Sequence, residues 1–227
     1  MAISLSACAG GGGDADGVPR PVGTEAEAQE AAGGTSCFGR AATKTGTPGD
    51  DRIEGSSGAD VIVTFGGNDR IRALGGNDVV CSGPGADVVR AGSGRDRVDA
   101  AAESDHVLGG RGEDVLRGRR GNDYLSGEGG ADRLLGGPGN DRGPASDPHS
   151  LGLDGGPGDD VIRGGPGKDH IDGIFENDRV FGEGGDDVLN GDSSDDFLDG
   201  GAGWDRLWGG GGTDVCRNGE HLADCEN

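Results

Sequence analysis

The chain has 227 residues, a formal net charge of −22 and 53 glycines. Leu, Ile, Val and Phe together number only 40, and few large apolar residues with a high net charge are typical of disordered chains. The glycines disfavour long helices, so an ordinary enzyme domain with a sizeable core is disfavoured. A repeat architecture is the exception, because stacked repeats let a few aliphatic side chains line a narrow core.

Charge and hydropathy also limit the kinds of partner that the chain can bind. No segment has the roughly 18 consecutive apolar residues that span a bilayer, so we expect no transmembrane segment. A strongly acidic chain repels phosphates and anionic headgroups, so we expect no nucleic-acid partner. A dense array of carboxylates attracts cations, which is the first indication of function.

Residues 1–45 lie before any repeat, and we expect a largely disordered leader or tether there. Residues 5–8, Leu-Ser-Ala-Cys, resemble a bacterial lipobox, and a glycine-rich stretch follows them. Only seven residues precede Cys8, however, which is too short for the apolar part of a signal peptide. Two interpretations stay open: lipid attachment at Cys8, or a disordered leader with a spare thiol.

The next 172 residues, 46–217, follow a nine-residue period marked by aspartate. An aliphatic residue stands two positions after the aspartate in 16 of 18 units, glycine stands two positions before it in 15, and glycine opens 13. Complete units read Gly-Gly-x-Gly-x-Asp-x-aliphatic-x, as in residues 109–117 and 200–208. The phased aspartates are Asp51, Asp60, Asp69, Asp78, Asp87, Asp96, Asp105, Asp114, Asp123, Asp132, Asp141, Asp160, Asp169, Asp178, Asp187, Asp196, Asp205 and Asp214.

Each unit reads as a glycine-rich turn followed by a three-residue strand with one buried position. A nine-residue unit cannot bury a core alone, so units must stack, and two units per coil would give nine or so coils. Every second aspartate would then lie above its predecessor, about 4.8 Å away. Like charges at that distance repel by roughly 1 kcal/mol even in water, so the aspartates need a counter-ion. Carboxylates and loop carbonyls without His or Cys favour Ca²⁺ over zinc or copper.

The nine-residue pattern closely resembles the hemolysin-type calcium-binding repeat of the RTX family. The resemblance implies an all-β fold, a right-handed parallel β-roll solenoid. It also implies that each Ca²⁺ is held between loop n and loop n+2 by the sixth-position aspartates and by loop carbonyls. The pairs with the most complete loops are Asp114 with Asp132, Asp123 with Asp141, Asp169 with Asp187, and Asp187 with Asp205.

Some units depart from the pattern, and calcium sites there are doubtful. The first glycine is replaced at Thr64, Ala73, Ser82, Ala91 and Ala100, and the fourth-position glycine is replaced at Glu103, Glu176 and Ser194. RTX toxins and proteases also carry a catalytic or pore-forming region before the repeats and a long C-terminal secretion signal. Here 45 residues precede the repeats and ten follow residue 217.

The phase breaks once, near residues 142–154. The interval from Asp141 to Asp160 is two units plus one residue, and Gly143 stands where the aliphatic residue is expected. Two interpretations stay open: a looped-out half-coil in a continuing roll, or a hinge between two separately capped rolls.

Five cysteines in a chain of this type suggest two disulfides and one cysteine left over. Cys216 occupies the last aliphatic position and Cys225 lies nine residues on, so their pairing would fix residues 218–227 as a C-terminal cap. Cys37 could pair with Cys81 and cap the other end, which leaves Cys8 unpaired. The alternative is isolated thiols. Disulfides would agree with an extracellular or cell-surface location.

The sequence contains no metalloprotease, serine-hydrolase or NTPase motif, so we expect no enzyme. An ice-binding solenoid would need threonines in register, and the seven threonines are not. The interpretation as an acidic disordered chain applies only to the metal-free state. We therefore expect a secreted or surface-anchored calcium-binding roll whose folding depends on Ca²⁺. The alternative is a spacer or adhesin-like module beside an enzyme or envelope partner, which the sequence does not identify.

Overall fold

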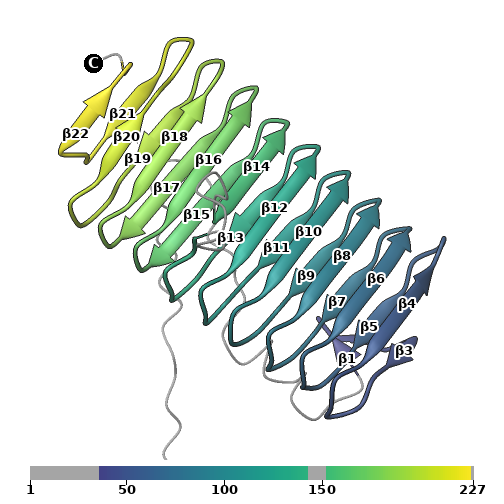
Figure 1. Cartoon of the computed structure of the whole chain (residues 1–227). Helices are drawn as coiled ribbons and strands as arrows, with labels where there is room; N and C mark the ends of the chain where they lie inside the picture. The colour runs from purple at the N-terminus through teal and green to yellow at the C-terminus, as the bar shows by residue number, and fades with distance from the viewer. Residues whose placement is uncertain (1–35, 143–151, 226–227) are drawn as a thin grey trace, which may run out of the picture.

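The computed structural model of the protein describes residues 36–142 and 152–225. Two parallel ten-stranded sheets run along a rod, and Figure 1 shows their strands stacked side by side from β4 to β22. Successive strands alternate between the sheets, so one coil contains two strands. Val89 pairs with Val107 and Val107 with Leu125, a register of 18 residues per coil. The predicted all-β roll is confirmed, with ten strands in each sheet and no helix in the described residues.

The two sheets are named here by the numbers of their strands. The even sheet contains β4 (Arg52–Ser56), β6 (Arg70–Gly75), β8 (Val88–Ser93), β10 (His106–Arg111), β12 (Tyr124–Gly129), β14 (Leu153–Pro157), β16 (His170–Phe175), β18 (Val188–Asp192), β20 (Arg206–Trp208) and β22 (His221–Ala223). The odd sheet contains β3 (Lys44–Thr45), β5 (Val61–Val63), β7 (Val79–Cys81), β9 (Arg97–Asp99), β11 (Val115–Arg117), β13 (Arg133–Leu135), β15 (Val161–Pro166), β17 (Arg179–Gly184), β19 (Phe197–Asp199) and β21 (Val215–Arg217).

Strand length differs between the sheets, and the expectation of uniform three-residue strands is wrong. Most odd strands have three residues, whereas β6, β8, β10, β12 and β16 have six. The longer strands continue through the first positions of the following loop, which still pair with the next coil, as Gly110 does with Glu128. The strands therefore extend past the last apolar residue of a unit and into the glycine-rich segment that follows it.

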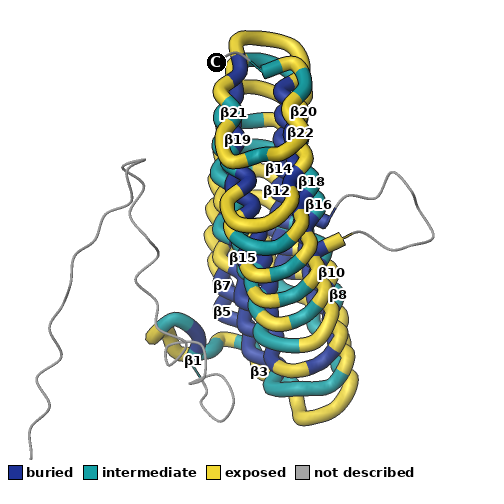
Figure 2. Tube along the Cα trace, turned by 90° about the vertical axis from the view of Figure 1, so that its left-hand side faces the viewer, coloured by how far each residue is buried: buried dark blue, intermediate teal, exposed yellow. Residues whose placement is uncertain are grey.

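The core is a narrow row of aliphatic side chains between the sheets. The inward residue of each unit, such as Leu116, Leu125 or Leu134, is fully buried. The buried positions follow the axis of the rod in Figure 2. Ala73, Ala91 and Ala100 join this core, because a loop that opens with alanine turns the methyl group inward. One large side chain per nine residues is thus enough to fill the space.

The roll is continuous across the break in the repeat. β12 pairs with β14 and β13 with β15, with a register of 28 residues instead of 18. Leu153 pairs with Leu125 and is fully buried, so Leu153 fills the aliphatic position of the unit that begins before Asp141. The assignment of that position to Gly143 is therefore wrong. The extra ten residues enter between Asp141 and Leu153, and residues 143–151 lie outside the described residues.

A small hairpin packs on the outer face of the odd sheet near the start of the rod. β1 (Ser36–Cys37) and β2 (Arg40–Ala41) are antiparallel, and Cys37 forms a disulfide with Cys81 of β7. A second apolar cluster forms beneath the hairpin from Cys37, Val61, Val63, Val79 and Cys81, with Phe38, Ala42 and Phe65 against it. The expectation that this disulfide caps the end of the rod is wrong, because Cys81 points outward from the third odd strand.

The last coil is closed by the second disulfide, Cys216 to Cys225. Cys216 pairs in register with Leu198 and packs against the core. β22 adds to the even sheet through Leu222, which pairs with Leu207. The residues after 217 therefore continue the roll for one more strand.

Candidate metal sites along the two edges

The phased aspartates form two ladders, one along each edge of the rod. Aspartates that precede even strands lie on edge A, and those that precede odd strands lie on edge B. Within each ladder, the backbone N–H of one aspartate donates to Oδ1 of the aspartate in the next coil, as from Asp96 to Asp114 at 2.8 Å. This contact persists across the inserted residues, from Asp132 to Asp160 at 2.6 Å. The structure therefore brings the aspartates together in the order that the period predicts.

The second carboxylate oxygen of most ladder aspartates is buried and accepts no hydrogen bond. Such an oxygen also occurs in the coils beside the inserted residues and in loops that do not open with glycine. A buried acceptor without a partner is costly, and an ionised one more so, and anionic oxygens in this state have the ligand chemistry of a cation site. The fifteen atoms are Oδ2 of Asp69, Asp78, Asp87, Asp96, Asp105, Asp114, Asp123, Asp132, Asp141, Asp160, Asp169, Asp178, Asp187, Asp196 and Asp205.

The opening glycine of a unit makes room for this oxygen. A Cβ on Gly118 would lie 2.2 Å from Oδ2 of Asp123, which is five residues further on in the same loop. In the loops that open with Ala73, Ala91 or Ala100, Oδ2 is still buried and unpartnered, at Asp78, Asp96 and Asp105. The burial of these atoms therefore does not distinguish complete loops from incomplete ones.

The fourth-position glycine determines how the loops stack. Gly112 has a φ of 131°, and a Cβ there would lie 1.7 Å from the carbonyl oxygen of Gly94 in the preceding coil. Glu103 and Glu176 avoid this clash with smaller φ values of 80° and 69°. Their peptide groups are thus rotated relative to those of the loops with glycine at this position. This difference supports the doubt that these two loops form calcium sites.

Burial raises the pKa of most ladder aspartates above its usual range. For Asp105 the pKa is raised to about 9 by burial and by the charges of Asp123 and Asp87. Burial and neighbouring ladder carboxylates raise the pKa of Asp141 and Asp178 to about 8. A cation would remove this penalty on the ionised form. The other raised values are about 7 for Asp132, Asp160, Asp169 and Asp196, and about 6 for Asp78, Asp87, Asp96, Asp114, Asp123 and Asp187.

The first coil differs from the others. Oδ2 of Asp51 accepts from the backbone N–H of Thr47 at 2.5 Å, and Oδ2 of Asp60 accepts from that of Ser56 at 2.6 Å. Although burial opposes it, the hydrogen bonds from Ser56 and Thr43 lower the pKa of Asp60. These two aspartates therefore already have the partners that later ones lack.

Two features of the edges were not predicted from the sequence. On edge A, Glu220 takes the place of a further aspartate and accepts from the backbone N–H of Asp205. Beside each aspartate ladder, fifth-position Asn or Asp side chains accept from the backbone of the next coil, as Asn77 does from Arg95 and Asn122 from Asn140. The recurrent Asn-Asp dipeptides in the sequence could have indicated these fifth-position contacts.

Carboxylates alone do not complete a metal site. No group of three or more His, Cys, Asp or Glu side chains in residues 36–142 and 152–225 is arranged to hold a metal ion. Peptide carbonyls must therefore supply part of any coordination shell, which suits a hard cation with several oxygen ligands. Within these same residues, no helix is long and apolar enough to cross a membrane.

Comparison with known protein families matches most of the chain to one family. The model of the RTX calcium-binding nonapeptide repeat matches residues 45–80, 82–116, 108–142, 153–180 and 181–216. The matched segments cover both ladders and stop on either side of the inserted residues. Comparison with curated proteins found no match.

Proposed function

Because the chain belongs to the RTX calcium-binding nonapeptide repeat family, we propose that it binds Ca²⁺ along both edges of the roll and that Ca²⁺ drives its folding. The observation that carries the proposal is the set of fifteen buried, unpartnered Oδ2 atoms. These atoms fit a hard cation, because they are anionic oxygens beside loop peptides and no Arg or Lys side chain is their hydrogen-bond donor.

The residues that would hold the ion are consecutive ladder aspartates with carbonyls of their loops. In each pair, Oδ1 is occupied by the backbone of the preceding coil and Oδ2 is free for the metal, as at Asp114 and Asp132. Bound Ca²⁺ would supply positive charge that offsets the repulsion along the ladder. Asp51 and Asp60 would contribute less, because their Oδ2 atoms already accept hydrogen bonds.

Coupling between binding and folding follows from the small core. Only one large aliphatic side chain per nine residues is buried, whereas ordering each residue costs roughly 1 to 2 kcal/mol of conformational entropy. Without the ion, ionised aspartates at raised pKa values add a further penalty. Binding energy must then contribute to folding, as in other small metal-dependent domains.

We further propose an extracellular or cell-surface location and no catalytic activity. The two disulfides support the location, because disulfides persist in oxidising compartments. Cys8 lies outside the described residues, and lipid attachment there remains a proposal that intact-mass spectrometry of the exported protein would test. The proposed role is that of a calcium-dependent structural module.

Circular dichroism during a Ca²⁺ titration tests the proposal, with Mg²⁺ at equal concentration as the control. We expect a coil-like spectrum in chelator and a cooperative gain of β signal in Ca²⁺. The midpoint should fall near the ~10⁻⁴ to 10⁻³ M of extracellular modules. A spectrum that is equally β-rich in chelator and in Ca²⁺ would overturn the coupling.

A further inference from the structure

The outer face of the even sheet carries a second group of carboxylates, apart from the two edges. Asp172 follows the inward-facing Ile171 in β16, so its side chain points outward. In register it lies between Asp154 of β14 and Asn190 of β18. Ser126 of β12 pairs with Asp154 on the other side. Four neighbouring strands thus place oxygen-bearing side chains in one row, about 4.8 Å apart.

Asp172 is unusual for an outward residue. Its exposed fraction is 6%, and its Oδ1 is buried without a hydrogen-bond partner. It is the only carboxylate outside the two ladders with such an orphaned oxygen among residues 36–142 and 152–225. An acidic side chain in this state needs a positive partner or a proton.

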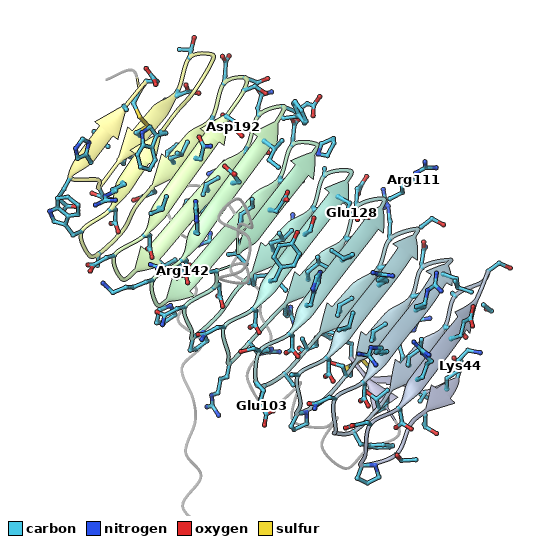
Figure 3. All side chains as sticks on the ribbon, viewed as in Figure 1. Lys44, Glu103, Arg111, Glu128, Arg142 and Asp192 are labelled. Atoms are coloured by element: carbon cyan, nitrogen blue, oxygen red, sulfur yellow. A yellow bond between two sulfur atoms is a disulfide. The ribbon has the colours of Figure 1, made fainter. Side chains whose placement is uncertain are left out.

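No Arg or Lys side chain of these strands supplies that partner, and burial together with the charge of Arg142 lowers the pKa of His170, the histidine of β16. β12, β14, β16 and β18 contain neither Arg nor Lys. The same outer rows in the first three even strands carry Arg52, Arg70, Arg72 and Arg90. Glu128 and Asp192, labelled in Figure 3, add two more acidic side chains at the ends of β12 and β18. Negative charge is therefore concentrated and uncompensated on this part of the sheet.

The amide of Asn190 interacts with both of its acidic neighbours. Burial raises the pKa of Asp172 to about 7 and outweighs a hydrogen bond from this amide, which favours the ionised form of Asp172. Nδ2 of Asn190 donates to Oδ1 of Asp192 at 2.8 Å. Ser126, at the opposite end of the row, is 6% exposed. The row therefore offers two adjacent carboxylates between a neutral hydroxyl and a neutral amide, and Oδ1 of Asp172 still lacks a partner, which suits a hard divalent cation.

We propose that Asp154 and Asp172 bind a Ca²⁺ ion on the outer face of the even sheet, with Ser126 and Asn190 beside it. This site uses strand residues and not the loop residues of the edges, so it adds one ion to those of the proposed function. It would also link β14 to β16 next to the point where the inserted residues enter the roll.

Native mass spectrometry of the full chain in Ca²⁺ at pH 8 tests the proposal by counting bound ions. D172N and D154N should each bind one ion fewer than the unchanged protein. E54Q is the matched control, because Glu54 occupies the same outward position in β4 but has an arginine, Arg72, opposite it in the strand register. E54Q should bind as many ions as the unchanged protein. All four proteins should give the same circular dichroism in Ca²⁺.

Each other outcome counts against the site. Equal ion counts in D172N, D154N and the unchanged protein would mean that the pair shares a proton and takes no metal. Loss of the roll in both variants would assign the pair a purely structural role. A complete absence of Ca²⁺ from the unchanged protein would instead refute the proposed function, so the two failures are distinguishable.

Discussion

The backbone N–H of Asp205 donates to Oε2 of Glu220 at 2.6 Å, the position that an aspartate Oδ1 occupies at every earlier step of edge A. Glu220 lies fifteen residues after Asp205, not eighteen, so its longer side chain compensates for a shorter last coil. The acceptor ladder on this edge thus ends on a glutamate that is out of phase with the repeat.

Removing this acceptor should loosen the end of the rod. We expect Glu220→Ala to cost about 1 kcal/mol or somewhat more, because the buried N–H of Asp205 loses its partner. Hydrogen exchange at the Asp205 amide should accelerate, together with that of β22. Glu113→Ala is the control, since Glu113 forms only an exposed ion pair with Arg95. Equal exchange at Asp205 in both variants would contradict a capping role.

The inserted residues should be dispensable for the roll. The chain returns beside its point of departure: a Cβ on Gly152 would lie 2.0 Å from the carbonyl oxygen of Asp141. Deleting residues 142–151 joins Asp141 to Gly152 and restores an unbroken spacing from Asp141 through Leu153 to Asp160. We expect this deletion to keep the Ca²⁺-dependent β signal. The control is Leu153→Ala, which should cost roughly 2 to 5 kcal/mol by opening a core cavity. A deletion variant as unstable as Leu153→Ala would refute this account of the break.

Without Ca²⁺, the roll should be more stable in mild acid than in mild base. In the folded state the pKa is about 9 for Asp105 and about 8 for Asp141 and Asp178, above the usual value near 4. Folded protein then binds more protons than unfolded protein, so this contribution is fully present below pH ~4. It is lost as the pH rises through 6 to 9, because other ladder aspartates such as Asp123 and Asp132 have pKa values of about 6 and about 7. Circular dichroism in chelator should show more β structure at pH 5 than at pH 8.5.

The same linkage between protonation and folding predicts that Ca²⁺ affinity changes with pH in the opposite direction to metal-free stability. Because Ca²⁺ competes with protons for the ladder carboxylates, its apparent affinity should rise from pH 5 to pH 8.5. Calorimetric titration at both pH values measures this change. An affinity independent of pH, together with chelator spectra that do not change with pH, would exclude the ladder as the binding element.

Loop completeness should determine which aspartates matter most. Asp123 follows a loop with Gly118 and Gly121, whereas Asp105 follows Ala100 and Glu103. Although Oδ2 is orphaned at both aspartates, the different φ at Glu103 changes the direction of the loop carbonyls. Asp123→Ala should therefore lose more bound Ca²⁺ than Asp105→Ala in calorimetric titration. An equal or larger loss in Asp105→Ala would show that loop composition is unimportant.

The repeat phase predicts much of the fold and the arrangement of the candidate sites. Because every aliphatic residue and aspartate keeps a nine-residue spacing, stacking two units per coil determines both the core and the ladders. The same reasoning places Cys216 at the last core position, where it bonds to Cys225. These features depend on local spacing, which a single sequence contains.

Other features depend on contacts that the spacing does not encode. The role of Leu153 as the aliphatic residue of its unit was not predicted, because an insertion can enter inside a unit as easily as between units. The position of the Cys37–Cys81 disulfide depends on which face of β7 the cysteine occupies, and Cys81 alternates outward from the buried Val80. Glu220 is out of phase with the repeat, and the row from Ser126 to Asn190 occupies the variable ninth position of the units, whose residue types the motif does not specify.

A crystal structure of the protein grown in Ca²⁺ tests the central claim most directly, with anomalous scattering to locate the ions. We predict a row of Ca²⁺ ions along each edge, each bound by Oδ2 of ladder aspartates from the second coil onward and by loop carbonyls. The contradicting result is a folded roll without ions at the edges, in which protons or water satisfy the Oδ2 atoms of residues such as Asp114 and Asp123.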